Sequence, residues 1–363
     1  MKGSQHVSGQ LFGYRELPAE SGLWGVLLPR PGEKPVAHEP VAQDVIESIN
    51  ADRLVFTRAD RVGNRGFGLS FGVYVGLMIC ATLLPLFLWG MTSAKVALSP
   101  WELFFFFSLL LCAGGIPLTW AYLSAKRALP PPIVISRSRR KVWTWLDHQK
   151  QWTALDYDRV TPATFVRRVV TGSGSATVYA LALCQLKPGT REIEFSVVPA
   201  PAQGTPQACG ELWEFIRRYM DGDPAALPAV RLVPPLDHPK AWMARSDRTV
   251  FAGQIDEQHR IKRDGFSMAV VWFWGSLGYW WERAAGWIER TAPRRPLPLE
   301  LQETAPGKSN SAYRVIPFTA IEQQAQAGTL PHMRRRWFIC GVIGTAVWGW
   351  LFGLLVVGIW VMR

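Results

Sequence analysis

The chain has 363 residues, a formal net charge of +12 and 18 tryptophans. Its mean hydropathy lies just above zero, which indicates a soluble majority joined to a smaller membrane-embedded part. The sequence carries none of the signatures of nucleic-acid-binding folds, so we interpret the basic balance as membrane orientation charge and expect no nucleic-acid partner.

Residues 1–65 predict an N-terminal cytoplasmic segment. Its polar sequence is rich in Pro and Gly, and the one apolar stretch, LWGVLL, is too short for a signal peptide. The cysteines of the chain have no CxxC spacing, which favours buried free thiols in a reducing compartment over disulfides or a zinc site. They are Cys80, Cys112, Cys184, Cys209 and Cys340.

Residues 66–127 predict a transmembrane helical hairpin. Uncharged apolar runs extend from Phe67 to Met91 and from Leu103 to Ala125, and each exceeds the roughly 20 residues that cross a hydrocarbon core. Arginines precede the first run and Lys126 and Arg127 follow the second, whereas the connecting loop is nearly uncharged. Because Lys and Arg are retained on the cytoplasmic side, both ends of the hairpin should be cytoplasmic.

Residues 128–225 predict an antiparallel β domain closed by a helix. Strands are expected around Val142–Trp145, from Trp152, on both sides of a GSGS turn at Gly172–Ser175, and within REIEFSVVPA. Thr205 is a suitable helix cap, Pro206 suits the first helical position, and the helix should end near Gly222. Its apolar face comprises Leu212, Trp213, Ile216, Tyr219 and Met220.

This order of strands and closing helix resembles a pleckstrin-homology-like barrel. The resemblance implies a cytoplasmic, antiparallel β-barrel-like domain with the helix packed across one open end. The segment Arg53–Arg61 could add an edge strand from before the hairpin. The RSRRK turn could bind anionic lipid headgroups just below the bilayer, and topology signal combined with a solvated turn is the alternative. Its charged residues are Arg137, Arg139, Arg140 and Lys141.

Residues 337–363 predict a third transmembrane helix, and residues 226–336 a cytoplasmic tail. RRR at Arg334–Arg336 places the start of the third helix in the cytoplasm. The uncharged run Phe266–Trp281 cannot also cross, because a crossing would move those arginines outside, and sixteen helical residues rise only about 24 Å.

We therefore expect an amphipathic helix at 266–290 that lies in the inner interface of the membrane, with a buried helix of the soluble domain as the alternative. Its polar residues repeat at seven-residue spacing, as Gly275/Glu282/Glu289 and Ser276/Arg283/Arg290, and form one narrow stripe. The other faces carry the residues that prefer the headgroup region. These are Trp272, Trp274, Trp280, Trp281 and Trp287.

Small residues four apart form a ridge on the first and third predicted spans, and such ridges let helices approach closely. We expect these two spans to pack on each other, with homodimerisation as the alternative. GLSFG at Gly68–Gly72 matches a nucleophile-elbow pattern, but it lies at the start of a helix and packing explains it better. The ridge residues are Gly68, Gly72 and Gly76 in the first span, and Gly341, Thr345, Gly349 and Gly353 in the third.

A second resemblance covers more of the chain. The polar N-terminal segment, the hairpin, IVISRSRRKVW, ALDYDRV, LWEFIRRYM and the Trp-rich tail resemble an uncharacterised family of bacterial inner-membrane proteins encoded near type VI secretion effectors. The resemblance implies a role as an immunity protein whose partner is a cognate toxin. It supplies no catalytic residues.

No residue pattern predicts chemistry. The histidines have no metal-ligand spacing, TGSGSAT lacks the form of a phosphate loop, and Asp156 and Asp158 are best read as a solvated strand end. The three spans hold no charged residue, so transport is not expected. We expect no cofactor or metal and no enzyme activity. The leading expectation is a non-catalytic α+β membrane protein that binds a toxin, and the alternative is a membrane scaffold or lipid-headgroup-binding protein.

Overall fold

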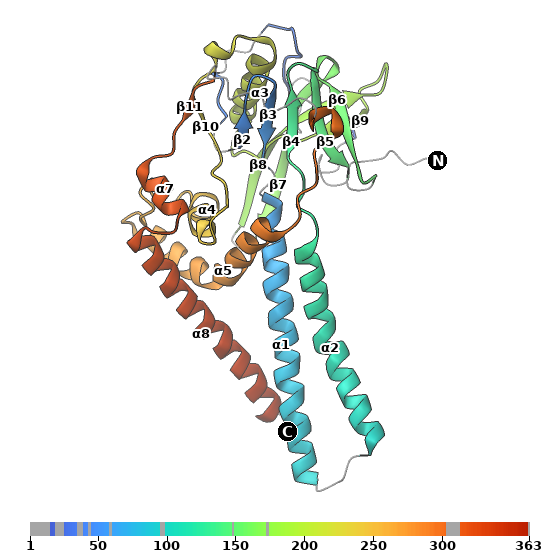
Figure 1. The fold of residues 1–363 in the computed structure, drawn as a ribbon, viewed down its shortest axis with the longest axis vertical. Helices are drawn as coiled ribbons and strands as arrows, with labels where there is room; N and C mark the ends of the chain where they lie inside the picture. The colour runs from blue at the N-terminus through green and yellow to red at the C-terminus, as the bar shows by residue number, and fades with distance from the viewer. Residues whose placement is uncertain are drawn as a thin grey trace. The chain divides into compact units, whose positions relative to one another are not determined.

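The computed structural model describes residues 15–18, 25–34, 39–42, 45–57, 60–94, 99–146, 149–171, 174–302 and 313–361. The protein is 49% helical and 21% strand, so the predicted α+β class is confirmed (Figure 1). The chain forms two compact units, each built from segments that are distant in sequence. The sheet unit comprises residues 1–60, 130–235 and 295–317, and the helical unit comprises 61–129, 236–294 and 318–363.

These units replace the five consecutive segments expected from the sequence. Residues before the hairpin supply strands to the sheet unit, so the first 65 residues are no separate segment. The tail at 226–336 is divided between the two units in the same way. A linear reading cannot detect this division, because contacts between distant segments leave no local pattern.

The sheet unit contains two antiparallel sheets with strand orders β1-β7-β8-β9 and β2-β3-β4-β5-β6. Short β10 and β11 pair in parallel as a third ladder. The strands are β1 (Gly25–Leu27), β2 (Ile46–Ile49), β3 (Arg53–Phe56), β4 (Ile133–Ser136), β5 (Lys141–Leu146), β6 (Gln151–Asp156), β7 (Thr161–Thr171), β8 (Gly174–Leu186), β9 (Ile193–Val197), β10 (Val230–Arg231) and β11 (Val315–Ile316).

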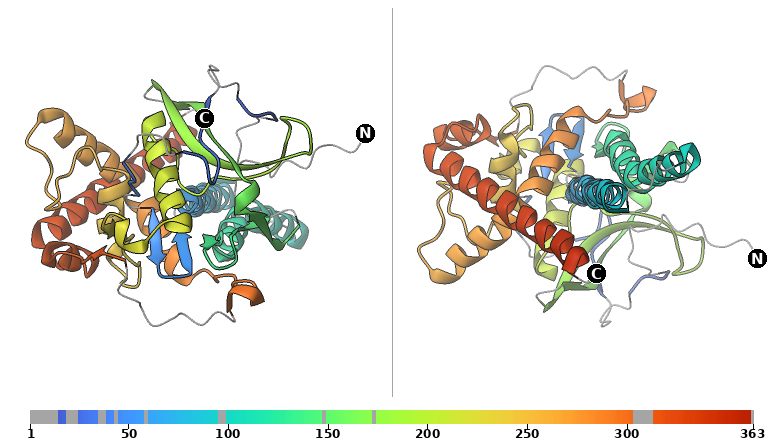
Figure 2. Two further views of the ribbon diagram at one scale, coloured as in Figure 1. Left: turned by 90° about the horizontal axis from the view of Figure 1, so that it is seen from above. Right: turned by 90° about the horizontal axis from the view of Figure 1, so that it is seen from below.

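Helix α3 (Pro206–Asp221) confirms the predicted closing helix. The Thr205 hydroxyl accepts from the amide of Ala208, and Gly222 is the C-cap. The predicted apolar face is buried in one core cluster that also contains residues of both sheets. Seen from above, α3 lies against β7 and β8 (Figure 2). Two short 3-10 turns, η1 (Tyr157–Arg159) and η2 (Pro224–Ala226), and the small helix α6 (Leu299–Gln302) complete the unit.

Two details of the predicted β domain are wrong. The described residues form no closed barrel, because η1 with its buried Tyr157 redirects the chain after β6, and β7 pairs with β1 and β8 instead. The predicted edge strand at Arg53–Arg61 is shorter, as β3, and is interior, since it pairs with both β2 and β4. Of the GSGS turn, residues 172–173 lie outside the described residues, and Gly174 already pairs with Thr171.

The helical unit contains α1 (Asp60–Ala94), α2 (Pro100–Lys126), α4 (Ala241–Thr249), α5 (Gly265–Thr291), α7 (Ala320–Gln326) and α8 (Pro331–Val361). Arg65–Leu84 in α1 and Pro100–Lys126 in α2 are long and apolar enough to cross a membrane. Seen from below, α1 and α2 are viewed nearly end on and stand side by side (Figure 2). The third span at 337–363 is helical to Val361, and its crossing of a membrane stays a prediction.

Candidate functional site

Glycines of α1 allow the backbone of α2 to approach closely. A Cβ at Gly72 would lie 2.6 Å from the Cβ of Ala121, and one at Gly76 would lie 2.9 Å from the carbonyl oxygen of Gly114. At Gly68 the nearest atom, on the ring of Trp120, would be 3.8 Å away, an ordinary contact. GLSFG lies wholly inside α1, so helix packing accounts for it.

Two residues of the α8 ridge, Gly341 and Thr345, contact α5 and not the ridge of α1. A Cβ at Gly341 would lie 2.8 Å from the ring of Tyr279. Thr345 accepts from the indole of Trp280 at 3.2 Å. Gly349 and Gly353 have nothing within 4 Å of a Cβ position. The first and third predicted spans do meet, but through Tyr74 and Trp348, whose rings stack at 5.1 Å.

Arg65, near the start of α1, caps the C-terminal end of α2. Its guanidinium donates to the carbonyl oxygens of Ser124 at 2.9 Å and Ala125 at 3.1 Å, and also to that of Arg127. These are carbonyls of the last turn of α2, which have no partner within the helix. The side chain therefore ties the start of α1 to the end of α2.

Helix α5 runs across the same end of the hairpin (Figure 1). A Cβ at Gly66 would lie 2.6 Å from the Cβ of Ala285, and the Leu129 amide donates to the carbonyl of Pro293 at 2.9 Å. The helix begins at its N-cap Asp264, whose carboxylate accepts from the Ser267 amide at 2.7 Å. Hydrogen bonds from Ser267 hold the pKa of Asp264 below its ordinary value. The predicted helix at 266–290 is thus confirmed within one residue at each end.

Most of the polar stripe of α5 packs against other helices of the unit, although Arg283 and Arg290 are exposed. Glu282 accepts from the Ser246 hydroxyl at 2.6 Å and from Arg245 at 3.2 Å, and Arg245 also reaches Glu289 at 2.6 Å. These three charged side chains are 10–16% exposed. A helix that lies on a membrane normally turns its whole polar stripe to water. Here α4 covers Glu282 and Glu289, α8 lies against Gly275 and Ser276, and only Arg283 and Arg290 of the stripe are exposed.

The outward face of α5 is aromatic. Phe266 is 72% exposed, Phe273 58% and Trp274 47%. The other four predicted interface residues are partly buried. Trp280 binds Thr345, Trp281 makes an edge contact with Phe67, and Trp287 lies under the ammonium of Lys126. Trp272 packs against the core of the helical unit. Among the five, Trp274 alone belongs to the exposed class, with about half of its surface accessible.

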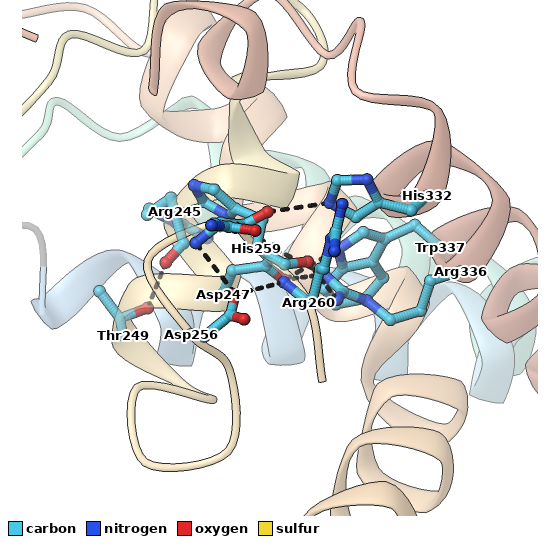
Figure 3. Close-up of polar contacts among 10 residues, drawn as sticks. Arg245, Asp247, Thr249, Asp256, His259, Arg260, His332, Arg336 and Trp337 are labelled. Carbon is cyan, nitrogen blue, oxygen red and sulfur yellow. Dashed lines mark hydrogen bonds and ion pairs between the residues drawn. The ribbon is translucent and has the colours of Figure 1, made fainter. Parts of the chain in front are cut away.

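A buried ionic cluster holds α4 and the start of α8 together (Figure 3). The Asp247 side chain is fully buried and accepts from both Arg336 at 2.5 Å and the Trp337 indole at 3.2 Å. His259 Nδ1 lies 2.8 Å from the same carboxylate, and Arg336 also donates to the His259 carbonyl at 3.0 Å. Each polar group of the carboxylate has a partner, as a buried charge requires.

This cluster changes the reading of two sequence features. His259, which the sequence marks only by its lack of metal-ligand spacing, is 4% exposed, and its backbone φ is 59° in the tight turn after Asp256. Arg334 and Arg335 are exposed, as orientation signals would be, whereas Arg336 is buried and neutralised by Asp247. His332 bonds the Gln258 carbonyl at 2.9 Å. His6, His38 and His148 lie outside the described residues.

The basic turn at residues 137–141 is occupied by partners within the sheet unit. Arg137 donates to the carbonyl of Gly222, Arg139 pairs with Glu300 at 3.2 Å, and Lys141 lies 5.7 Å from the centroid of the Trp143 ring. Arg140 binds both Asp158 and Asp221, and its guanidinium lies over the ring of Tyr157. The three arginines thus have acceptors within the sheet unit, whereas Lys141 is exposed; lipid binding by this turn stays a prediction.

Arg140 is the centre of a coupled set of ionisable groups. Its hydrogen bonds hold the pKa of Asp158 below its ordinary value, in spite of slight desolvation. Burial and the neighbouring Asp221 carboxylate raise the pKa of Tyr157. The Tyr157 hydroxyl donates to Asp221 at 2.9 Å. Asp156 lies at the exposed end of β6, as expected, and its carboxylate also accepts from the Asp158 amide in η1. Asp158 has a specific cation, Arg140, as partner.

The cysteines are free, as predicted, but not all are buried. Cys184, Cys209 and Cys340 are buried, Cys80 is half-buried and Cys112 is exposed on α2. Burial raises the pKa of Cys209 to about 12, which keeps its thiol neutral and unreactive. Within the described residues, no group of three or more His, Cys, Asp or Glu side chains is placed to hold a metal ion.

Sequence reasoning missed Arg245, Asp247 and the proline-rich segment at residues 293–298. The two charged residues lie in ordinary surface-like sequence, and only their tertiary partners distinguish them. The proline-rich segment had a detectable signal, because PRRPLP places three prolines within six residues.

We compared the chain with protein-family models, curated proteins and solved structures, and none of them matches. The fold therefore defines the class: an α+β protein with two helices long and apolar enough to cross a membrane.

Proposed function

We propose that the protein is a three-span, non-catalytic protein of the bacterial inner membrane that presents its sheet unit to the cytoplasm. The observation that carries the membrane part is the exposed aromatic face of α5, which comprises Phe266, Phe273 and Trp274. An aromatic face at the base of a long apolar hairpin suits the interface of a bilayer, where Trp is enriched. In this proposal α1, α2 and α8 cross the membrane and α5 lies in its inner interface.

The orientation can be tested by accessibility of single cysteines in a chain whose native cysteines are replaced. Glu257 lies in an exposed turn before α5, and Ser311, outside the described residues, follows it. Both positions should react with an impermeant maleimide only after the inner membrane is opened. Labelling of the two from opposite sides would show that α5 crosses.

We further propose that the partner is a cognate toxin delivered by type VI secretion, which the protein binds and neutralises. This part rests on the resemblance in element order. Deletion of the gene should sensitise the cell to a rival that delivers the toxin, and the full chain should restore survival. If the deletion strain survives beside such a rival, the immunity role is wrong while the membrane topology stands.

Binding of anionic lipid headgroups is a second candidate, now placed at α5 and not at the basic turn. Arg263 precedes the helix, Arg290 lies in its last turn, and both are exposed. Phosphatidylglycerol added to the full chain in detergent micelles should change Trp fluorescence more than phosphatidylcholine does. An Arg263→Gln/Arg290→Gln variant should lose that difference, and the matched Arg139→Gln variant should keep it.

A further inference from the structure

The outer face of the five-stranded sheet is aromatic. Along β5, Val142 belongs to the main core cluster, so Trp143 and Trp145 point to the opposite side of the sheet, as the two-residue period of a strand requires. Trp152 of β6 is the register partner of Trp145, and their rings meet edge to face at 5.9 Å. Val55, Val134 and Ala154 share this side.

One segment of the same unit covers this face: the proline strap, residues 295–302, which reads RPLPLELQ. Leu297 and Leu301 pack in a cluster with Val134 and Trp143. The residues before α6 belong to no helix or strand. Pro296 and Pro298 fix their own φ and favour an extended backbone at the residue before each, so this segment is pre-organised.

Polar contacts fix the strap on the tryptophans. The guanidinium of Arg295 lies 4.1 Å from the ring centroid of Trp145, and the indole of Trp152 donates to the Pro296 carbonyl at 3.0 Å. Arg53 donates to the Leu301 carbonyl, and Arg139 pairs with Glu300 at 3.2 Å. A stacked Arg, an indole bonded to a proline carbonyl and a Leu in an apolar site are the contacts by which aromatic grooves bind extended proline-rich peptides.

The strap leaves two donors of the groove unused. The indole nitrogens of Trp143 and Trp145 are buried and have no hydrogen-bond partner in the structure. A buried donor without an acceptor costs about 1 to 3 kcal/mol. A segment whose carbonyls reached these nitrogens would bind the face more tightly than the strap does, residue for residue.

We infer that the outer face of β3–β6 is a docking site for an extended Arg-Pro-Leu-Pro segment of a partner protein, and that the strap is its intramolecular competitor. Tethering gives the strap an effective concentration of about millimolar, so a partner segment must bind better or be brought close by other contacts. This inference goes beyond the proposed function, and it holds or fails whether or not the partner is a toxin.

The test uses the full chain in detergent micelles and a fluorescein-labelled peptide with the sequence of residues 293–302, PRRPLPLELQ. The Leu297→Asp/Leu301→Asp variant removes both apolar anchors of the strap and opens the face. Fluorescence anisotropy should show the peptide binding to this variant at least tenfold more tightly than to the wild type. A peptide with both arginines replaced by alanine should bind several-fold more weakly, because it cannot stack on Trp145.

Adding Trp152→Phe to the Leu297→Asp/Leu301→Asp variant tests the hydrogen bond alone, since it keeps an aromatic ring and removes the indole donor. It should weaken binding several-fold. Equal binding with and without that donor, or no binding to an opened variant with native circular dichroism, would overturn the inference. If the opened variant does not fold, the wild-type chain provides the test. Millimolar peptide should then displace the strap and speed hydrogen exchange at residues 297–302. Unchanged exchange at these residues would contradict the inference.

Discussion

Helices α3 and α5 are both amphipathic and both begin at a side-chain cap, yet the side chains that they expose differ in polarity. Helix α3 buries Trp213, Phe215 and Tyr219 and exposes no large apolar side chain. Helix α5 buries Glu282 and Ser276 and exposes Phe266, Phe273 and Trp274. The same amphipathic principle explains both if water surrounds α3 and an apolar phase meets α5. Buried charge does not separate the two helices, because α3 also buries Glu214 and Arg217. The exposed large apolar side chains of α5 are what distinguish it from α3.

Removal of the largest side chain on the inward face of α3 gives the largest expected effect. Trp213→Ala should lower the free energy of unfolding by about 3 to 5 kcal/mol, because it leaves a cavity and also removes the hydrogen bond from the indole to the Pro29 carbonyl at 2.8 Å. Chemical denaturation in detergent micelles measures this loss. Trp274→Ala on α5 should change that stability little, and a loss as large as at Trp213 would refute the outward placement of Trp274.

The inward stripe of α5 can be broken at its central carboxylate. Glu282→Ala leaves the Ser246 hydroxyl and part of the Arg245 guanidinium unpaired in a buried site, which should cost about 2 kcal/mol. The loss is limited because Arg245 keeps Glu289. Thermal unfolding in detergent measures it, with Gln207→Ala on the exposed side of α3 as the control. If Glu282→Ala proved neutral, the stripe would not be the packed face of α5.

The two glycine ridges offer a sharper contrast within the helical unit. Gly72→Leu forces side-chain atoms into the backbone of α2 and should destabilise the unit by about 1 to 3 kcal/mol. Gly349→Leu should have little effect on the isolated chain, because nothing lies within 4 Å of its Cβ position. The melting temperatures of the two variants in one detergent compare them directly. Equal losses would mean that α8 uses its ridge in a contact other than the one with α5.

The smallest effect is expected from pH, in the sheet unit. Because the folded-state pKa of Asp158 is depressed, its contribution to stability is present above its ordinary value of 3.8 and is lost as the pH falls below that value. Asp158→Asn should therefore make unfolding less dependent on pH between about 5 and 3. The effect is small because the carboxylate is half exposed and Arg140 keeps Asp221. An unchanged pH profile would place the acid sensitivity elsewhere, for example at Asp52.

Local signals in the sequence were sufficient for individual elements. The cap at Thr205, Pro206 and the apolar face placed α3, and the uncharged run with its seven-residue polar repeat placed α5 within one residue at each end. The uncharged runs likewise gave the two membrane-compatible helices. These signals are local, because a helix cap or an apolar run acts over a few neighbouring residues.

The partners of each element could not be predicted in the same way. The ridge of α1 contacts α2 and that of α8 contacts α5, although both ridges have the same spacing. Arg336 and Arg334 belong to one basic run, yet only Arg336 finds the carboxylate of Asp247. The four-residue spacing of small residues shows that another helix can pack closely on a ridge, but it does not determine which helix does so.

The sequence by itself determined the α+β class, the apolar hairpin, the closing helix and the limits of the Trp-rich helix. Only the tertiary structure decided that residues before the hairpin complete a sheet, that the barrel stays open, and that residues 295–302 cover its tryptophans. The physical reason is that caps and periodicity specify backbone conformation locally. Burial of Asp247, Glu282 and Trp143 depends on side chains far along the chain, which meet only when the protein folds.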